Sequence, residues 1–151
     1  LLQAFKYGGR KILGRFFSGV LFDFVSSRLD AASFDALAAV PMDTRKENER
    51  GFNQARLLCR LLADRTAKPD LSAGLARRRP DSSSQSRLGR RARARNISGS
   101  FAAKKPFFFA GRNVLLVDDI LTTGFTASEC AKTLKIAGAS SVTLLVVARG
   151  F

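Results

Sequence analysis

Apolar residues recur every three to four positions in two stretches of the N-terminal half, which predicts two amphipathic helices. The first helix is expected within 10–29, where the apolar positions form a wide stripe: Ile12, Phe16, Phe17, Val20, Leu21, Phe24 and Val25. The second is expected over 52–66, with Asn53 as its N-cap. Between them, the short apolar run 34–40 predicts a strand and the polar stretch 41–51 predicts a loop.

The C-terminal third shows a strand, helix, strand pattern. Residues 113–117 are β-branched or leucine without alternation, which is typical of a strand in the middle of a sheet covered on both faces. Residues 125–137 have helical spacing and end at Gly138, and 142–148 form a second apolar strand. Such a unit predicts parallel strands joined by a right-handed crossover. Residues 106–110 also have the pattern of a strand.

These elements predict a single α/β domain over 1–151, with a mostly parallel central sheet flanked by helices. The chain of 151 residues is long enough for one hydrophobic core and too short for two independent ones. It has no apolar run long enough to span a membrane and no recognisable signal peptide, so we expect a cytoplasmic protein without a membrane span.

Two residue types limit the chemistry. The chain contains no histidine, which excludes Ser-His-Asp and Cys-His catalysis and histidine-ligated metals. Its two cysteines, Cys59 and Cys130, both lie in helical patterns among apolar or small residues, so we expect them to be core residues. Two isolated cysteines without histidine form no zinc site.

The charge is strongly positive. Lys and Arg number 26 and Asp and Glu number 12, which gives a net charge of +14 and favours anionic partners. Residues 77–98 contain eight arginines and a single acid, Asp81, so this stretch contributes +7. Its serines and its lack of large apolar residues predict an exposed, flexible loop. A solvated loop without a ligand remains the alternative interpretation.

The sequence Asp118 to Thr126, DDILTTGFT, follows the first of the two C-terminal strands and precedes the helix. In open α/β sheets, ligands bind at the carboxyl ends of the strands. Threonine hydroxyls and main-chain amides at a helix N-terminus favour a phosphate, and Gly124 allows the backbone to turn tightly around it. The two acids can accept hydrogen bonds from sugar hydroxyls or hold Mg²⁺ through water. This combination predicts a sugar-phosphate site; the alternative is a solvated turn.

Several motifs resemble a known family. The stretch Val114 to Thr126 resembles the PRPP-binding signature of type I phosphoribosyltransferases. Val40-Pro41, followed by Arg45 and by RGFNQA at 50–55, resembles the ComF/GntX competence-related family. A third segment also resembles that family. It starts at Gln85-Ser86 and continues through Arg91 and Arg95-Asn96 to Phe101.

The resemblance implies a type I phosphoribosyltransferase fold with PRPP and Mg²⁺ as ligands, and a role in DNA uptake or in the use of DNA as a nutrient. Asp118 and Asp119 are then the candidate catalytic residues, which would bind the ribose hydroxyls and hold Mg²⁺ through water. The residues implied for the 5-phosphate are Leu121, Thr122, Thr123, Gly124, Phe125 and Thr126. Those implied for the pyrophosphate side are Arg45, Lys46 and Arg50. Those implied for the flexible active-site loop are Gln85, Arg91, Arg95 and Asn96.

Residues 1–35 are implied to form a helical hood over the acceptor, whose identity the sequence leaves open. Many members of the family carry a cysteine-rich zinc ribbon, and no zinc is expected for this chain. Three functions remain in view. The first is a phosphoribosyltransferase of unknown acceptor. The second is a non-catalytic PRPP-sensing module that binds single-stranded DNA or a protein of the competence machinery through the basic loop. The third is a regulator that keeps the fold and has lost catalysis.

Overall fold

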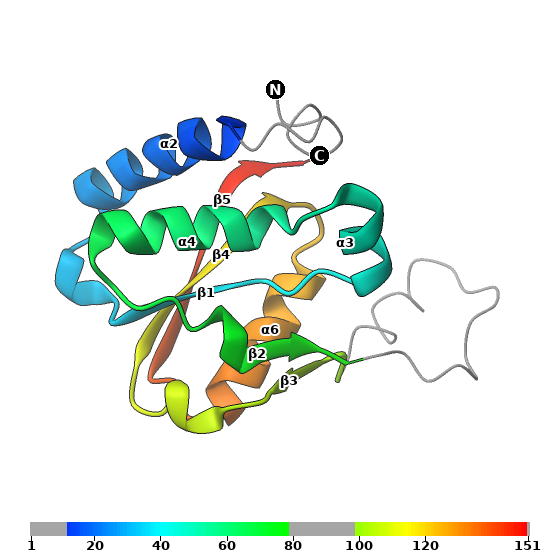
Figure 1. Cartoon of the computed structure of the whole chain (residues 1–151). Coiled ribbons are helices and arrows are strands. Elements are labelled where there is room, and N and C mark those ends of the chain that lie inside the picture. The colour runs from blue at the N-terminus through cyan, green and yellow to red at the C-terminus, as the bar shows by residue number, and fades with distance from the viewer. Residues whose placement is uncertain (1–11, 79–98, 151) are drawn as a thin grey trace.

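The computed structural model describes residues 12–78 and 99–150. Its centre is a three-stranded parallel sheet in the order β1-β4-β5 (Figure 1). Strand β1 covers Ala36–Ala39, β4 covers Asn113–Leu121 and β5 covers Ser141–Arg149. The parallel pairing of β4 with β5, joined by a helix, confirms the predicted strand, helix, strand unit, and β4 lies in the middle of the sheet as expected.

Helices cover both faces of the sheet. Helices α2 (Ile12–Arg28) and α4 (Gln54–Thr66) pack with Leu115 and Val117 of β4 in one hydrophobic cluster. Helix α6 (Phe125–Ile136) contributes Cys130 and Leu134 to a second cluster, which contains Val114 and Leu116. Successive side chains of a strand point to opposite faces, so a strand buried on both faces has to be apolar throughout. That requirement explains the unbroken apolar run of β4.

The two predicted amphipathic helices are confirmed as α2 and α4. Asn53 caps α4 as expected, because its side chain accepts a hydrogen bond from the Arg56 amide at 3.2 Å. One helix was missed, since α3 (Thr44–Arg50) lies within the stretch predicted to be a loop. Asp43 caps α3 by accepting from the Arg45 amide at 3.0 Å. Helix α3 buries no residue, so no apolar periodicity indicated it.

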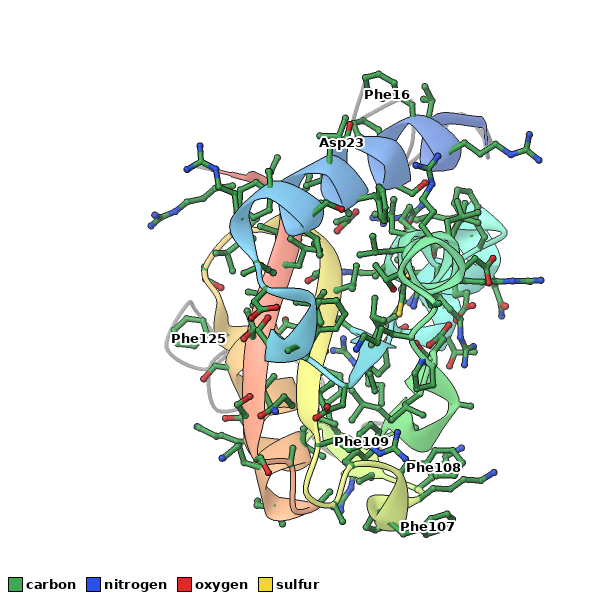
Figure 2. The ribbon with its side chains drawn as sticks, turned by 90° about the vertical axis from the view of Figure 1, so that its left-hand side faces the viewer. Phe16, Asp23, Phe107, Phe108, Phe109 and Phe125 are labelled. Atoms are coloured by element: carbon green, nitrogen blue, oxygen red, sulfur yellow. The ribbon has the colours of Figure 1, made fainter. Side chains whose placement is uncertain are left out.

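The predicted strand at 106–110 is wrong. Residues Pro106–Phe108 form a 3₁₀ turn with proline at its start, where the missing amide proton is not needed. The ring of Phe109 is fully buried, whereas Phe107 is 71% exposed and lies at the periphery of the molecule (Figure 2). The apolar run therefore reflects one anchoring aromatic ring and not a strand.

A second, two-stranded antiparallel sheet lies beside the main one. Strand β2 (Leu75–Arg77) pairs with β3 (Phe101–Ala103), with Leu75 opposite Ala103. The two strands lead into and out of the predicted basic loop, which lies outside the described residues except for Arg77 and Arg78. Among the helices of the described part, none has the length and apolar character needed to cross a membrane.

Candidate functional site

The two candidate acids lie in a strand and not in the loop that follows it. Strand β4 continues to Leu121, so Asp118 and Asp119 extend from the sheet just beyond the point where β1 ends. One oxygen of each carboxylate is held by a main-chain amide. The Asp119 amide donates to Asp118 Oδ1 at 2.8 Å, and the Ile120 amide donates to Asp119 Oδ1 at 2.8 Å. Both carboxylates line one pocket, where these bonds fix their orientation.

The turn between β4 and α6 leaves the N-terminus of a twelve-residue helix without a side-chain cap. Gly124 occupies the cap position in the left-handed conformation, with φ of 78°, and its carbonyl accepts from the Ser128 amide at 2.9 Å. The first amides of a helix have no partner within it, and the helix dipole places positive potential there. The Gly150 amide donates to the Leu121 carbonyl at 2.8 Å and fixes the turn against the end of β5. The turn therefore fits an anion.

One pocket unites most of the predicted site residues. It is lined by both acids, by the turn and by two cations of α3: Asp118, Asp119, Leu121, Thr122, Thr123, Gly124, Thr126, Lys46 and Arg50. Two predicted residues do not line it. The Arg45 side chain is 88% exposed and pairs with Glu49 at 3.3 Å. The Phe125 ring is 45% exposed and points away from the sheet (Figure 2). The loop candidates Gln85, Arg91, Arg95 and Asn96 lie outside the described residues.

Sequence reasoning missed other residues of the pocket, above all Arg77, Asp43 and Asn53. Arg77 Nε lies 3.9 Å from Asp43 Oδ2, and its guanidinium lies over the Phe101 ring, 5.7 Å from the ring centroid. Asn53 Nδ2 donates to the Val40 carbonyl at 3.3 Å, which joins the start of α4 to the end of β1. Arg77 was visible only as one of many arginines, and its position depends on the pairing of β2 with β3.

The cysteines take no part in this chemistry. Cys59 and Cys130 are both free thiols and fully buried, as expected for core residues. Burial raises the pKa of each thiol well above its usual value, and the negative charge of Asp118 raises the pKa of Cys130 further. Since the thiolate is the reactive form, burial and the raised pKa disfavour reaction at either thiol in the folded protein.

The donor chemistry of the pocket fits Mg²⁺ in a limited way. Within 12–78 and 99–150, no group of three or more His, Cys, Asp or Glu side chains could hold a metal by itself. Asp118 and Asp119 bring two carboxylates to the pocket. Magnesium is commonly held by one or two carboxylates together with water and substrate phosphates. These residues therefore suit an ion that arrives with a phosphorylated ligand, and they do not form a complete protein cage.

The fold is phosphoribosyltransferase-like. Its features are the parallel sheet, the acid pair at the end of the central strand and the helix without a side-chain cap that follows. Two solved structures share it. A glutamine PRPP amidotransferase from Bacillus subtilis, complexed with ADP and GMP, matches with a TM-score of 0.57 and 20% identity, over 92% of this chain and 26% of that chain. A structure described as the allosteric regulatory enzyme of purine biosynthesis matches with a TM-score of 0.58 and 19% identity, over 89% of this chain and 25% of that one. At these identities the likeness shows the fold alone.

The chain belongs to the phosphoribosyl transferase domain family, whose model matches residues 66–150. Its curated relatives include the DNA utilization protein YhgH of Escherichia coli K12, at 34% identity over 76% of this chain and 49% of the relative. Competence protein F of Haemophilus influenzae is 32% identical over 76% of this chain and 50% of the relative. Competence protein ComFC of Bacillus subtilis is 32% identical over 95% of this chain and 58% of the relative.

These relatives confirm the resemblance to the competence-related family. The chain spans about half the length of the curated relatives that it matches, so the comparison covers this domain and not their remaining sequence.

Proposed function

We propose that the pocket binds the ribose 5-phosphate part of PRPP together with Mg²⁺. The observation that carries this proposal is the location of two oriented carboxylates and an uncapped helix N-terminus in one pocket, separated by a short turn. A carboxylate pair alone would repel a phosphate, and a helix N-terminus alone would bind any anion. Together they match a ligand that carries hydroxyls at one end and a phosphate at the other.

The proposed contacts follow from the positions of the donors and acceptors. Asp118 and Asp119 accept hydrogen bonds from the ribose hydroxyls, while Thr122, Thr123 and the amides at the start of α6 donate to the 5-phosphate. Lys46 lies in the same pocket and offsets negative charge. Asp118 and Asp119 would hold Mg²⁺ through water, and the ion would supply charge neutralisation for the pyrophosphate.

The reaction that such a site supports is pentosyl transfer. A nitrogen nucleophile forms a bond to C1 of the ribose and gives its proton to solvent, while the C1–O bond breaks and its electron pair leaves with pyrophosphate. Fixed carboxylates and an uncapped helix end need little rearrangement in the transition state, so positioning and charge stabilisation contribute most of the catalysis. The names of the relatives, DNA utilization protein and competence protein, favour a setting of competence and DNA utilisation. We propose a cytoplasmic location for this function, with proteins of the competence machinery as partners.

Calorimetric titration of PRPP with Mg²⁺ tests the proposal. We expect saturable binding to the wild-type chain and a loss of affinity of about tenfold or more in the Asp118→Asn/Asp119→Asn variant, since charge-assisted hydrogen bonds are lost. Asp23→Asn/Asp64→Asn is the matched control, because it also removes two carboxylate charges from exposed residues that do not line the pocket. Asp23 lies on the outer side of α2 (Figure 2). Absence of binding to the folded wild type, or equal binding by all three proteins, would refute the assignment.

A second candidate is a PRPP-sensing module without catalysis that binds single-stranded DNA. The observation that favours it is the +7 charge of 77–98, which begins in β2 beside the pocket. Affinity for a single strand should then fall steeply as salt rises, because bound cations are released from the phosphates. PRPP binding without turnover on any nucleobase or amine, together with salt-dependent DNA binding, would favour this candidate over the enzyme.

A further inference from the structure

Helix α2 is apolar on its outer face as well as on the face that it buries. Its inner face carries Leu21 and Val25, which are buried in the core together with α4 and β4. Its outer face carries Phe16, Val20 and Phe24, which are 56%, 49% and 50% exposed. A helix that covers one face of a sheet needs a single apolar stripe, so the fold of one copy does not explain the outer one.

The three outer residues form one continuous ridge. Phe16, Val20 and Phe24 are spaced by four residues, so they follow one another along the same face of the helix. The Phe16 ring packs edge-on against the buried Phe17 ring, with 5.4 Å between the ring centroids, which orients it. Beside the ridge Gly19 leaves a notch, because an added Cβ there would meet nothing within 4 Å. Single exposed apolar residues are ordinary, whereas a contiguous apolar patch indicates a contact surface.

Two opposite charges flank the ridge. Arg15 and Asp23 are both exposed, and neither forms an ion pair with a residue of 12–78 or 99–150. Figure 2 shows Asp23 on the outer side of α2, as is Phe16. The two charges are eight residues apart, about 12 Å along the helix axis, which is too far for an ion pair within one copy. Since Gly19 lies midway between them, the outer face is basic at one end and acidic at the other.

We propose that the outer face of α2 is the contact surface of a homodimer, in which two copies of α2 cross antiparallel about a two-fold axis near Gly19 and Val20. A face with opposite charges at its two ends is self-complementary in the antiparallel orientation alone. That orientation brings Arg15 of each copy to the level of Asp23 in the other, so two ion pairs form. Val20 of each copy packs at the notch beside Gly19 of the other, as ridges of one helix pack into grooves of the next.

The dimer is expected to be weak. A standard interface buries about 800 Å² on each partner, more than one face of a single helix provides. Exposed ion pairs add little affinity and are screened by salt, so they determine the orientation more than the strength of the contact. We therefore expect a dissociation constant in the micromolar range. The proposal is independent of PRPP binding, because no residue of this face lines the candidate pocket.

Sedimentation equilibrium over a range of chain concentrations tests for the dimer. The wild type should shift from monomer to dimer as the concentration rises. Phe16→Ala/Phe24→Ala should weaken association by about a hundredfold or more, because both large apolar side chains of each copy lose their contacts. The matched control is Phe107→Ala/Ile136→Ala, which removes two apolar side chains that lie outside α2 and are 71% and 88% exposed. Thermal melting verifies that both variants are folded.

Exchange of the two charges tests the antiparallel orientation. Arg15→Asp should weaken the dimer by about fivefold or more at low salt, because two attractive pairs become repulsive. Arg15→Asp/Asp23→Arg should restore the wild-type dissociation constant, since each pair forms again with its signs exchanged. A parallel pair of helices would place like charges together in both variants, so it predicts no restoration.

Three results would overturn the proposal. A wild-type chain that stays monomeric up to millimolar concentration would show that the outer face of α2 does not bind a second copy. Equal weakening by the two apolar double variants would show that association is nonspecific. Failure of the charge exchange to restore association would refute the antiparallel contact, even if a dimer forms.

Discussion

The substitution Gly124→Ala would test how the backbone of the turn contributes to stability and to phosphate binding, because it leaves the threonine side chains of the turn in place. Gly124 has φ of 78°, a conformation that costs an L-residue on the order of 1–2 kcal/mol. An added Cβ would lie 3.6 Å from Leu121 Cδ1, an ordinary van der Waals contact, so backbone strain is the main expected effect. For a domain of this size, that cost lowers the melting temperature by roughly 2–8 °C.

Gly51 provides an internal control, because it has the same backbone angles as Gly124, φ of 78° and ψ of −8°. A Cβ on Gly51 would meet nothing within 4 Å, and Gly51 does not line the pocket. Gly51→Ala and Gly124→Ala should therefore lose similar stability in thermal melts. The two variants should differ in affinity for ribose 5-phosphate.

Relief of the strain at Gly124 would rotate the amides that face the proposed phosphate. The loss of one charge-assisted hydrogen bond, about 1.5–3 kcal/mol, corresponds to about 10- to 150-fold in affinity. Calorimetry with ribose 5-phosphate measures this loss, and Gly51→Ala should bind as the wild type does. If Gly124→Ala melts as expected and still binds with unchanged affinity, the turn does not hold the phosphate and the reasoning is refuted.

Three further predictions concern the core, a thiol and the cations of α3. Leu134→Ala should lower the free energy of unfolding by about 2–5 kcal/mol in urea titrations, because Leu134 is fully buried. Ile136→Ala is the control on the same helix and should change this free energy by about 0.5 kcal/mol or less, because Ile136 is 88% exposed. Burial raises the pKa of the Cys59 thiol, so the free energy of unfolding should fall as the pH rises above about 9, where the unfolded chain alone loses the proton; a free energy that stays level from pH 8 to 10 would contradict this. Lys46→Ala should weaken PRPP binding measured by calorimetry, since Lys46 lines the pocket, while Arg45→Ala should leave it unchanged. A larger loss of affinity in Arg45→Ala than in Lys46→Ala would show that the side chains of α3 face the other way in solution.

The parts of the fold that were predicted correctly are those in which burial determines which positions of the sequence have to be apolar. The stripes of α2 and α4 and the unbroken apolar run of β4 each follow from the faces that these elements bury. Helix α3 buries nothing, and its signals are a capping Asp43 and a terminal Gly51, both of which also suit a loop. The wrong strand prediction at 106–110 arose because an apolar run was present without a strand. Phe109 is buried in the core from an irregular segment, and its burial needs no strand.

The candidate site was predictable where it is contiguous in sequence. The acids and the phosphate turn lie within one short stretch, so their chemistry could be read directly, although β4 extends through both acids. The contribution of Arg77 depends on strand pairing and on its contacts with Asp43 and Phe101, which no local pattern encodes. Arg45 and Lys46 are adjacent in sequence and both exposed, and only the position of α3 determines that Lys46 lines the pocket while Arg45 does not.

The central place of β4 in the sheet also determines which part of the site can open first. Residues 114–117 pair with β1 on one side and with β5 on the other, so their amides exchange with solvent mainly through global unfolding. The turn at 122–124 lies beyond the strand, so it can open in smaller fluctuations. Hydrogen exchange should therefore be slow at 114–117, which lead directly into the two acids, and fast in the turn that receives the phosphate. A ligand would encounter the sugar-binding end already formed and would complete the order of the phosphate-binding end as it binds.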